Sequence, residues 1–254
     1  MAELSTLICF ALKEEAAPFR TFAARKPGLV ILLTGIGRQN AEKAVRDLLV
    51  GGASVPASRS RGDSIAQNRL VSSLAPPELV LTCGFAGGLN PDLKLGDVVF
   101  DIRRSRGDET QIKGGKQSEP THVGCYDLRE QLLAASAKPA NFFCADRVVT
   151  TVAEKRKLRD ESGADAVEME SAAIHAVCRE RGIPCATIRV ISDSVNEDLP
   201  LDFNALSRPD KSLDYGRLFL AIAKSPGKIR ALMKLQKQTR FAAERLAEVL
   251  VDIL

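Results

Sequence analysis

The segment Ala166–Asp193 constrains the fold more than any other part of this chain. Its sequence, AVEMESAAIHAVCRERGIPCATIRVISD, predicts in order a short strand, an acidic turn, an amphipathic helix, a Gly-Ile-Pro break and a second strand. Two carboxylates, Glu170 and Asp193, lie at the polar edges of this unit. We expect the unit to bring both acids to one pocket.

The remainder of the chain alternates in the same way between apolar runs and helical patterns. Strands are expected at 4–11, 29–34, 78–83, 95–100, 140–145 and 148–151, and helices at 13–23, 39–50, 65–74, 127–137, 153–162, 171–181 and 210–224. Such alternation predicts an α/β fold, with a mixed, largely parallel central sheet flanked by helices. At 254 residues the chain, 1–254, is expected to form a single domain.

Two segments stand apart from this alternation. Residues 51–69 are small, polar and rich in Gly, Ser and Arg, which predicts a surface insertion. Residues 226–254 predict a long amphipathic helix with a basic first half. Such a helix either packs on the domain or on another subunit, or lies on a membrane surface.

Composition excludes several classes of protein. The net charge is only +4, and the basic residues form no cluster with aromatic ones, so we expect no nucleic-acid partner. The six cysteines form no C-x-x-C pair and several lie in apolar runs, which indicates reduced core cysteines, no zinc site and a cytoplasmic protein. The sequence contains no signal peptide pattern and no run of about 20 apolar residues.

The chemistry available to this chain rests on carboxylates and arginines. It has two histidines, His122 in an expected loop and His175 on an expected helix surface, and no serine in a G-x-S-x-G setting. Glu170 follows an apolar strand, where a carboxylate can accept hydrogen bonds from the two hydroxyls of a ribose; the alternative is a cap for the following helix. Ser192 and Asp193 end an apolar strand, where a carboxyl group can act as a general acid or can simply form a turn or cap.

Three other turns leave alternatives open. Glu14 and Glu15 begin a helix, where acids are favoured by the helix dipole, or they serve a site. Gly35 and Gly37, with Arg38, form a glycine turn before a helix, which is suited to an anion or hydroxyl group. The glycines of 84–88 either let the backbone approach a ligand or serve strand packing.

Together these segments resemble the nucleoside phosphorylase and nucleosidase superfamily, and most of all bacterial methylthioadenosine/S-adenosylhomocysteine nucleosidases and related purine phosphorylases. The resemblance covers about residues 7–205 and is carried, in family order, by FALKEEAAPF, TGIGRQNA, CGFAGGLNPDLKLGDVVF, AVEMESAAIHAVC and IRVISD. It implies a nucleoside phosphorylase-like domain that cleaves the N-ribosidic bond of an adenine-type purine nucleoside. No metal or redox cofactor is implied.

The resemblance also implies roles for individual residues. Glu170 would bind the ribose hydroxyls, Asp193 would protonate the purine, and Glu15 would position or activate water. Residues that would line the substrate are Met169 beside the sugar, Ser192 beside Asp193, Arg189 beside the nucleophile, Phe85, Ala86 and Gly87 along the base, and Val148 and Val149 in the base pocket. Phe85 stands where the nucleosidases usually carry a hydroxyl residue, and the 145–149 segment has no aromatic residue to stack on a base.

The charge of Glu15 bears on whether the nucleophile is water or phosphate. Glu15 favours water, since a carboxylate repels phosphate, and hydrolysis is therefore the expected reaction. Phosphorolysis is the alternative, with inorganic phosphate held by Arg189, Arg38 and the Gly35–Gly37 turn. The chain also resembles the phosphorylase-like enzymes of hopanoid biosynthesis, which remove adenine from an adenosyl-hopane. This resemblance implies phosphorolysis of a lipid-linked nucleoside as a further alternative, which a basic tail helix on a membrane surface would suit. The last alternative is a module that binds a nucleoside without cleaving it.

Members of this superfamily are commonly oligomers, so a homo-oligomer is expected.

Overall fold

The structure, a computed structural model, describes residues 6–49, 76–102, 123–206, 227 and 229–254. Eight strands of these residues form one sheet: β1 Thr6–Phe10, β2 Leu29–Leu33, β3 Leu79–Gly88, β4 Val98–Asp101, β5 Lys138–Pro139, β6 Phe142–Cys144, β7 Ala166–Glu168 and β8 Cys185–Asp193. The main path runs β2-β1-β3-β8-β4-β5, and β7 joins β3 to β6 at one end. Pairs along β2-β1-β3-β8 are parallel, whereas β4 runs antiparallel to β8 and β7 antiparallel to β3. The expected mixed, largely parallel sheet is confirmed.

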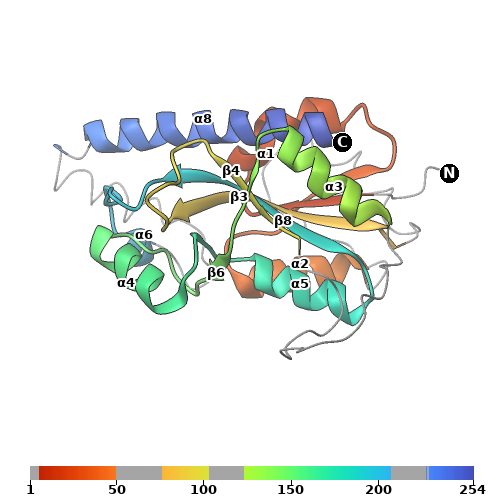
Figure 1. The fold of residues 1–254 in the computed structure, drawn as a ribbon, viewed down its shortest axis with the longest axis horizontal. Helices are drawn as coiled ribbons and strands as arrows, with labels where there is room; N and C mark the ends of the chain where they lie inside the picture. Colours follow the sequence, from red (N-terminus) through yellow and green to blue (C-terminus); the bar gives the residue numbers. More distant parts are fainter. Residues whose placement is uncertain (1–5, 50–75, 103–122, 207–226, 228) are drawn as a thin grey trace, which may run out of the picture.

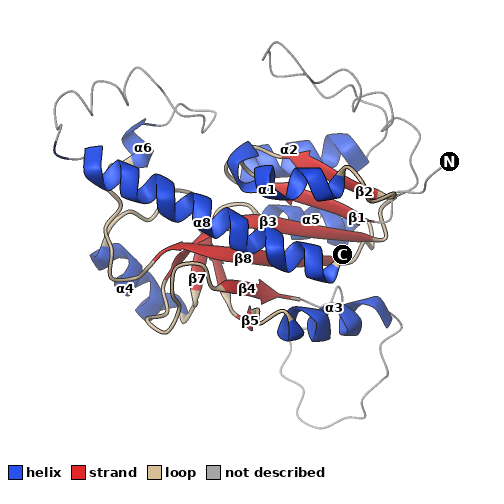
Figure 2. Ribbon diagram, turned by 90° about the horizontal axis from the view of Figure 1, so that it is seen from above, coloured by secondary structure: helices blue, strands red, loops and turns tan. Residues whose placement is uncertain are grey.

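Helices cover both faces of this sheet (Figure 1). The described helices are α1 Lys13–Ala23, α2 Arg38–Leu49, α3 Val123–Ala134, α4 Val152–Ser162, α5 Ser171–Glu180, α6 Phe203–Leu206 and α8 Ile229–Ile253. Helices α1 and α8 lie on one face and α2 and α5 on the other (Figures 1 and 2). Side chains along β1 point alternately to the two faces of the sheet. Ile8 and Phe10 belong to the core under α1 and α8, and Leu7 and Cys9 belong to the core between the sheet and helices α2 and α5.

The central strand β8 is buried along its whole length, which is typical of a parallel strand covered on both faces. Two of its buried residues, Arg189 and Asp193, have charged side chains. Because β1, β3 and β8 are parallel, the residues that follow or end them gather at one edge of the sheet. Glu15 at the start of α1, the last glycines of β3 and Asp193 thus approach the same edge.

Helix α8 differs between its two halves. From Ala242 to Ile253 it buries seven residues against α1, α3 and β8, so the expected packing on the domain is confirmed for this half. From Ile229 to Phe241 none of its residues is buried, and Met233 is 55% exposed. None of the helices that the structure describes is long and apolar enough to cross a bilayer.

Most of the expected strands and helices within the described residues are present. The structure differs from the sequence prediction in one strand, one turn and one side chain. The strand expected at 148–151 is absent: the backbone N–H and C=O of Val148 bond to the side-chain amide of Asn204 instead of a neighbouring strand. The segment Gly84–Gly88 is not a turn but the continuation of β3, as in the strand-packing alternative. His175 is not a surface residue of α5, because it is half-buried and its Nε2 lies 2.8 Å from Thr187 Oγ1 on β8.

Other predictions fall partly or wholly outside the described residues. They are the insertion at 51–69, the helices at 65–74 and 210–224, the loop at 103–121 with His122, and the first residues of the tail. Cys9, Cys83, Cys144, Cys178 and Cys185 are free thiols, and all but Cys144 are buried, as expected for reduced core cysteines.

Candidate active site

The site is built around Arg189, which is 1% exposed in the middle of the sheet. Its Nη2 bonds to Glu168 Oε2 at 2.7 Å and lies 3.4 Å from Glu170 Oε2. The same guanidinium donates to Thr82 Oγ1 and to the Cys83 carbonyl on β3. One buried cation therefore faces two buried carboxylates, while its Nε has no hydrogen-bond partner among the residues that the structure describes.

The two acids of the Glu168-Met169-Glu170 run have different environments. Glu168 Oε2 accepts from the backbone N–H groups of Glu170 and Ser171, so Glu168, and not Glu170, caps α5. Burial acts to raise the pKa of Glu168, but Arg189 and these hydrogen bonds outweigh it and lower that pKa. Glu168 is therefore the ionised partner of Arg189.

Glu170 is held by the glycine turn after β2, and its pKa is raised. Its Oε1 accepts from the backbone N–H of Gly37 at 2.8 Å, which ties the glycine turn after β2 to the start of α5. Burial raises the pKa of Glu170, Arg189 opposes this effect, and the neighbouring Glu168 carboxylate adds to it, so the net pKa is raised. The adjacent Met169 is half-buried.

Glu15 reaches the site from the first turn of α1. Its Oε2 accepts from the backbone N–H of Leu12, a helix-start contact, and its Oε1 accepts from the N–H of Phe85 on β3, both at 2.8 Å. Burial, opposed chiefly by Arg189 and by the Phe85 N–H, raises the pKa of Glu15 to about 7. Both sequence interpretations of Glu15 are thus compatible: it begins a helix, and it is a buried titratable acid.

Gly84 leaves the space in which Glu15 and Arg189 approach β3. A Cβ on Gly84 would lie 2.6 Å from Arg189 Nη1 and 2.6 Å from Glu15 Oε1, and the residue has φ +147°. Only glycine leaves room there for a carboxylate and a guanidinium at the same point of a strand. The side chain of Phe85 packs against the core under α1 and α8, whereas Ala86 belongs to a cluster on the opposite face.

Asp193 lies at the end of β8, apart from the Arg189 cluster. Its Oδ1 accepts from Ser192 Oγ at 2.8 Å, and its Oδ2 accepts from Lys155 Nζ of α4 at 2.5 Å. Its Oδ2 would lie 3.3 Å from a Cβ on Gly87. Lys155 was not predicted from the sequence, although its spacing of three from Val152 and Leu158 puts it on the apolar stripe of α4.

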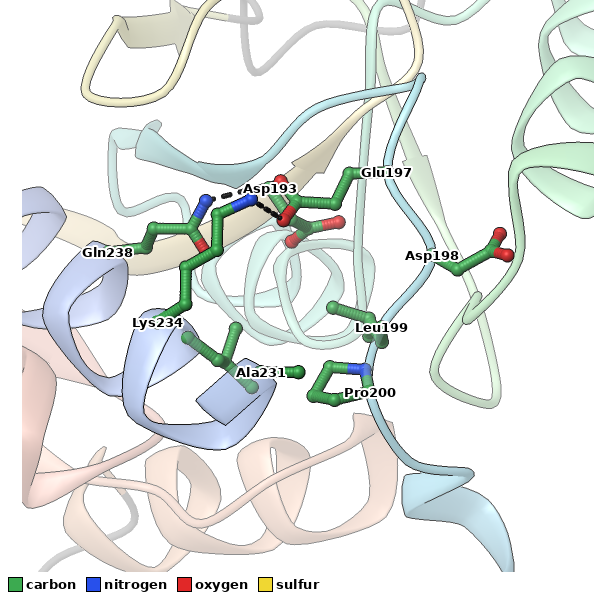
Figure 3. A pocket seen from close by; sticks show the side chains of 9 residues that line it. Asp193, Glu197, Asp198, Leu199, Pro200, Ala231, Lys234 and Gln238 are labelled. Atoms are coloured by element: carbon green, nitrogen blue, oxygen red, sulfur yellow. Dashed lines mark hydrogen bonds and ion pairs between the residues drawn. The ribbon is translucent and has the colours of Figure 1, made fainter. Parts of the chain in front are cut away.

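A pocket of about 140 Å³ opens on Asp193 (Figure 3). The loop after β8 and the first half of α8 line it, and Lys234 and Gln238 of α8 bond to Glu197 of that loop. Glu15 and Glu170 are not among its lining residues. This pocket thus includes Asp193 without Glu170, and its volume is below the 300–1,000 Å³ typical of ligand sites.

The remaining sequence candidates have protein partners. Arg38 is half-exposed, donates to the carbonyl of Cys144 and lies 3.4 Å from Asp146. Gly35 and Gly37 have φ of 79° and 89°, as a glycine turn requires. Val148 is bound through its backbone to Asn204, and Val149 packs beside a small apolar cluster that includes Ala145 and Val167.

The chain is similar to proteins of one family. A model of the Phosphorylase superfamily matches residues 12–212. A 5′-methylthioadenosine/S-adenosylhomocysteine nucleosidase of Shewanella oneidensis is 31% identical over 156 residues, 56% of this chain and 66% of that protein. The corresponding protein of Glaesserella parasuis is 28% identical over 148 residues, 53% of this chain and 64% of that protein. The matched part thus spans slightly less than two thirds of these relatives.

Solved structures agree on the fold over nearly the whole chain. A futalosine hydrolase of Helicobacter pylori has a TM-score of 0.59 at 19% identity and covers 98% of this chain and 97% of its own. A 5′-methylthioadenosine/S-adenosylhomocysteine nucleosidase of Neisseria meningitidis in complex with methylthio-immucillin-A has a TM-score of 0.61 at 18% identity, with 98% of both chains covered. Because the family model matches most of the chain and the fold agrees, this chain belongs to the phosphorylase superfamily.

Proposed function

We propose that this chain hydrolyses the N-ribosidic bond of an adenine-type purine nucleoside. The names of its relatives, methylthioadenosine/S-adenosylhomocysteine nucleosidases and a futalosine hydrolase, support cleavage of a nucleoside by water. The single observation that carries the choice is Glu15. It is a fully buried carboxyl group whose pKa is raised to about 7, beside the backbone of β3.

A group with that pKa is suited to general base catalysis at neutral pH. With a pKa of about 7, the Glu15 carboxyl group is partly ionised at neutral pH, and its carboxylate form can take a proton from an attacking water molecule. Its two contacts with the N–H groups of Phe85 and Leu12 fix the direction of the carboxylate before substrate binds. Glu15 is therefore the proposed base.

The partners of the cations favour water over phosphate. Arg189 is bonded to Glu168, Thr82 and Cys83, and the N–H of Gly37 is bonded to Glu170. A phosphate ion would have to displace these contacts, and it would meet the carboxylates of Glu15, Glu168 and Glu170 around a single guanidinium. Arg38 likewise already binds Cys144 and Asp146.

The other two acids suit the two halves of the substrate. Rupture of the bond leaves a cationic sugar and an anionic base, so a carboxylate beside the sugar and a proton donor beside the base both lower the barrier. Glu170 is the proposed ligand of the ribose hydroxyls, and Asp193 is the proposed donor to the base. Glu15 contacts β3 at Phe85 and Asp193 approaches it at Gly87, two residues or about 7 Å further along the strand.

The test is a nucleoside panel in phosphate-free buffer. The protein would be incubated with 5′-methylthioadenosine, S-adenosylhomocysteine, futalosine and adenosine, and the free base and the sugar product would be measured by chromatography. We expect a free base and a free ribosyl sugar without added phosphate. Activity that requires phosphate and yields a sugar 1-phosphate would replace hydrolysis with phosphorolysis. Tight binding of a nucleoside with no release of base would favour the non-catalytic binding module.

A further inference from the structure

Lys155 is the one buried residue of α4, and its side chain has no exposed surface. Its Nζ donates to three acceptors: Asp193 Oδ2 at 2.5 Å, the Ser194 carbonyl at 2.8 Å and the Glu197 carbonyl at 2.8 Å. A lysine in a protein core is rare unless it is paired, so these contacts explain how it is accommodated. They also join α4 to the end of β8 and to the loop that follows.

The geometry fixes where the proton of this pair rests. Three acceptors require three N–H groups, which an ammonium has and a neutral amine lacks. Asp193, for its part, accepts at both oxygens, from Lys155 at Oδ2 and from Ser192 at Oδ1. With three acceptors around Nζ and a donor at each oxygen of Asp193, this arrangement places the transferable proton on Lys155 and none on Asp193.

This arrangement bears directly on the proposed reaction, in which the leaving base takes up a proton beside Asp193. We propose that Lys155 holds this proton in the free protein and supplies it to the base through Asp193. The inference rests on the proposed function. Lys155 acts on the base only through Asp193, so it is a positioning and proton-supplying residue.

The step balances as follows. One proton moves from Lys155 Nζ to Asp193, and Asp193 delivers one proton to a ring nitrogen of the base. The electron pair of the broken C–N bond goes to the base, and water gives its hydroxyl group to the sugar and a proton to Glu15. Solvent then takes the proton of Glu15 and returns one to the lysine amine, so no other reactant is needed.

Other charged groups near the pair have their own partners. On the loop, the Glu197 carboxylate is paired with Lys234 of α8 at 2.6 Å, and Asp198 accepts from the N–H of Val152 at 2.6 Å. On α4, Arg156 donates to a loop asparagine and Glu154 is paired with Arg147. The facing stretch of β3, residues 84–88, carries no charged side chain.

The experiment is a double-mutant cycle with Lys155→Met, Asp193→Asn and the two combined, measured as adenine released from 5′-methylthioadenosine. If Lys155 acts only through Asp193, the two single changes lower kcat to similar extents and the double variant is within about threefold of Asp193→Asn, because residues that act as a unit are not additive. The control is Lys157→Met, an exposed lysine on the same helix, which should leave kcat unchanged.

The pH profile separates proton supply from mere support of the loop. In Lys155→Met the alkaline fall of kcat/KM should move to lower pH, because the proton is no longer stored on a nitrogen. A Lys155→Met protein with a lower rate but an unmoved alkaline limb would overturn the inference, as would one with the wild-type rate.

A buried carboxylate without its partner can prevent folding, and the uncharged double variant avoids this problem. If Lys155→Met does not fold, the double variant is compared with Asp193→Asn alone. Equal residual rates within about threefold support the inference, and a further loss of about tenfold or more overturns it. Wild-type activity in Asp193→Asn would instead contradict the proposed function of Asp193. That outcome differs from a loss of activity in Asp193→Asn with none in Lys155→Met, which would contradict only the inference about Lys155.

Discussion

Replacement of Glu15 by glutamine should change how the stability of the protein depends on pH. The pKa of Glu15 is raised from its ordinary value of 4.5 to about 7, chiefly by burial. Between these two values the folded state binds more protons than the unfolded state, so stability falls as pH rises. Stability from this group is complete below about pH 4.5 and is lost as pH rises through about 7.

The magnitude follows from the size of the shift. A difference of about 2.5 pH units at 1.36 kcal/mol each amounts to about 3 kcal/mol of unfolding free energy. In Glu15→Gln this pH-dependent part disappears. Glutamine offers one acceptor where Glu15 uses two, so the variant also loses about 1–3 kcal/mol at every pH. The difference between pH 5 and pH 8, and not the absolute stability, therefore tests the argument.

The assay is urea unfolding at half-unit steps from pH 5 to pH 8, followed by circular dichroism. Wild type minus Glu15→Gln should lose about 2.5 kcal/mol across this range, since the rest of the total is lost below pH 5. Glu14→Gln is the matched control, since Glu14 is the exposed neighbour on the same helical turn and should follow wild type. In parallel, kcat/KM of the wild type should rise with pH through about 7 as the base ionises. Parallel stability curves for wild type and Glu15→Gln would refute the assigned pKa and with it the role of Glu15 as a base.

Three further predictions concern the site and the assembly. Gly84→Ala should unfold at a lower temperature and lose activity, since its Cβ would lie 2.6 Å from both Arg189 Nη1 and Glu15 Oε1; a thermal melt indistinguishable from wild type would contradict this. Glu170→Gln should lower kcat/KM by about 100-fold or more, with most of the loss in kcat, in steady-state assays of base release; an effect confined to KM would show that Glu170 only binds the ground state. Light scattering after size exclusion should give a mass at least twice that of one chain, and a single-chain mass would contradict the expected homo-oligomer.

The sequence predicted the framework of this fold because its central strands, β1, β3 and β8, are buried on both faces. Such strands are nearly continuous apolar runs, as β1, β3 and β8 are, and they stand out without any knowledge of tertiary contacts. The prediction of a strand was wrong where a residue distant in sequence binds the backbone. The apolar stretch at 148–151 has strand composition, but its backbone is bonded to Asn204, more than 50 residues away in sequence.

The same distinction holds for the candidate site. Glu15, Glu170 and Asp193 were named as candidates because each lies at the start or end of a regular element, and the family resemblance decided between a site and a helix cap or turn. The functions of Glu168 and Lys155 depend on their partners, Arg189 and Asp193, which come from β8 and are 21 and 38 residues away. The signal that existed was a charged residue in an apolar context, since such a residue must have a partner that the sequence does not name.

The arrangement of charge in the site suits a reaction that creates a cation. Three buried carboxyl groups, those of Glu15, Glu168 and Glu170, share one guanidinium, and only Glu168 has a lowered pKa. The other two have raised pKa values chiefly because they are buried, and the one guanidinium does not offset the effect of burial. Under the proposed reaction, the sugar becomes cationic as its bond to the base breaks, and it supplies the missing charge beside Glu170. The carboxylate form of Glu170 is then favoured more strongly in the transition state than in the free protein, and it is this difference that accelerates the reaction.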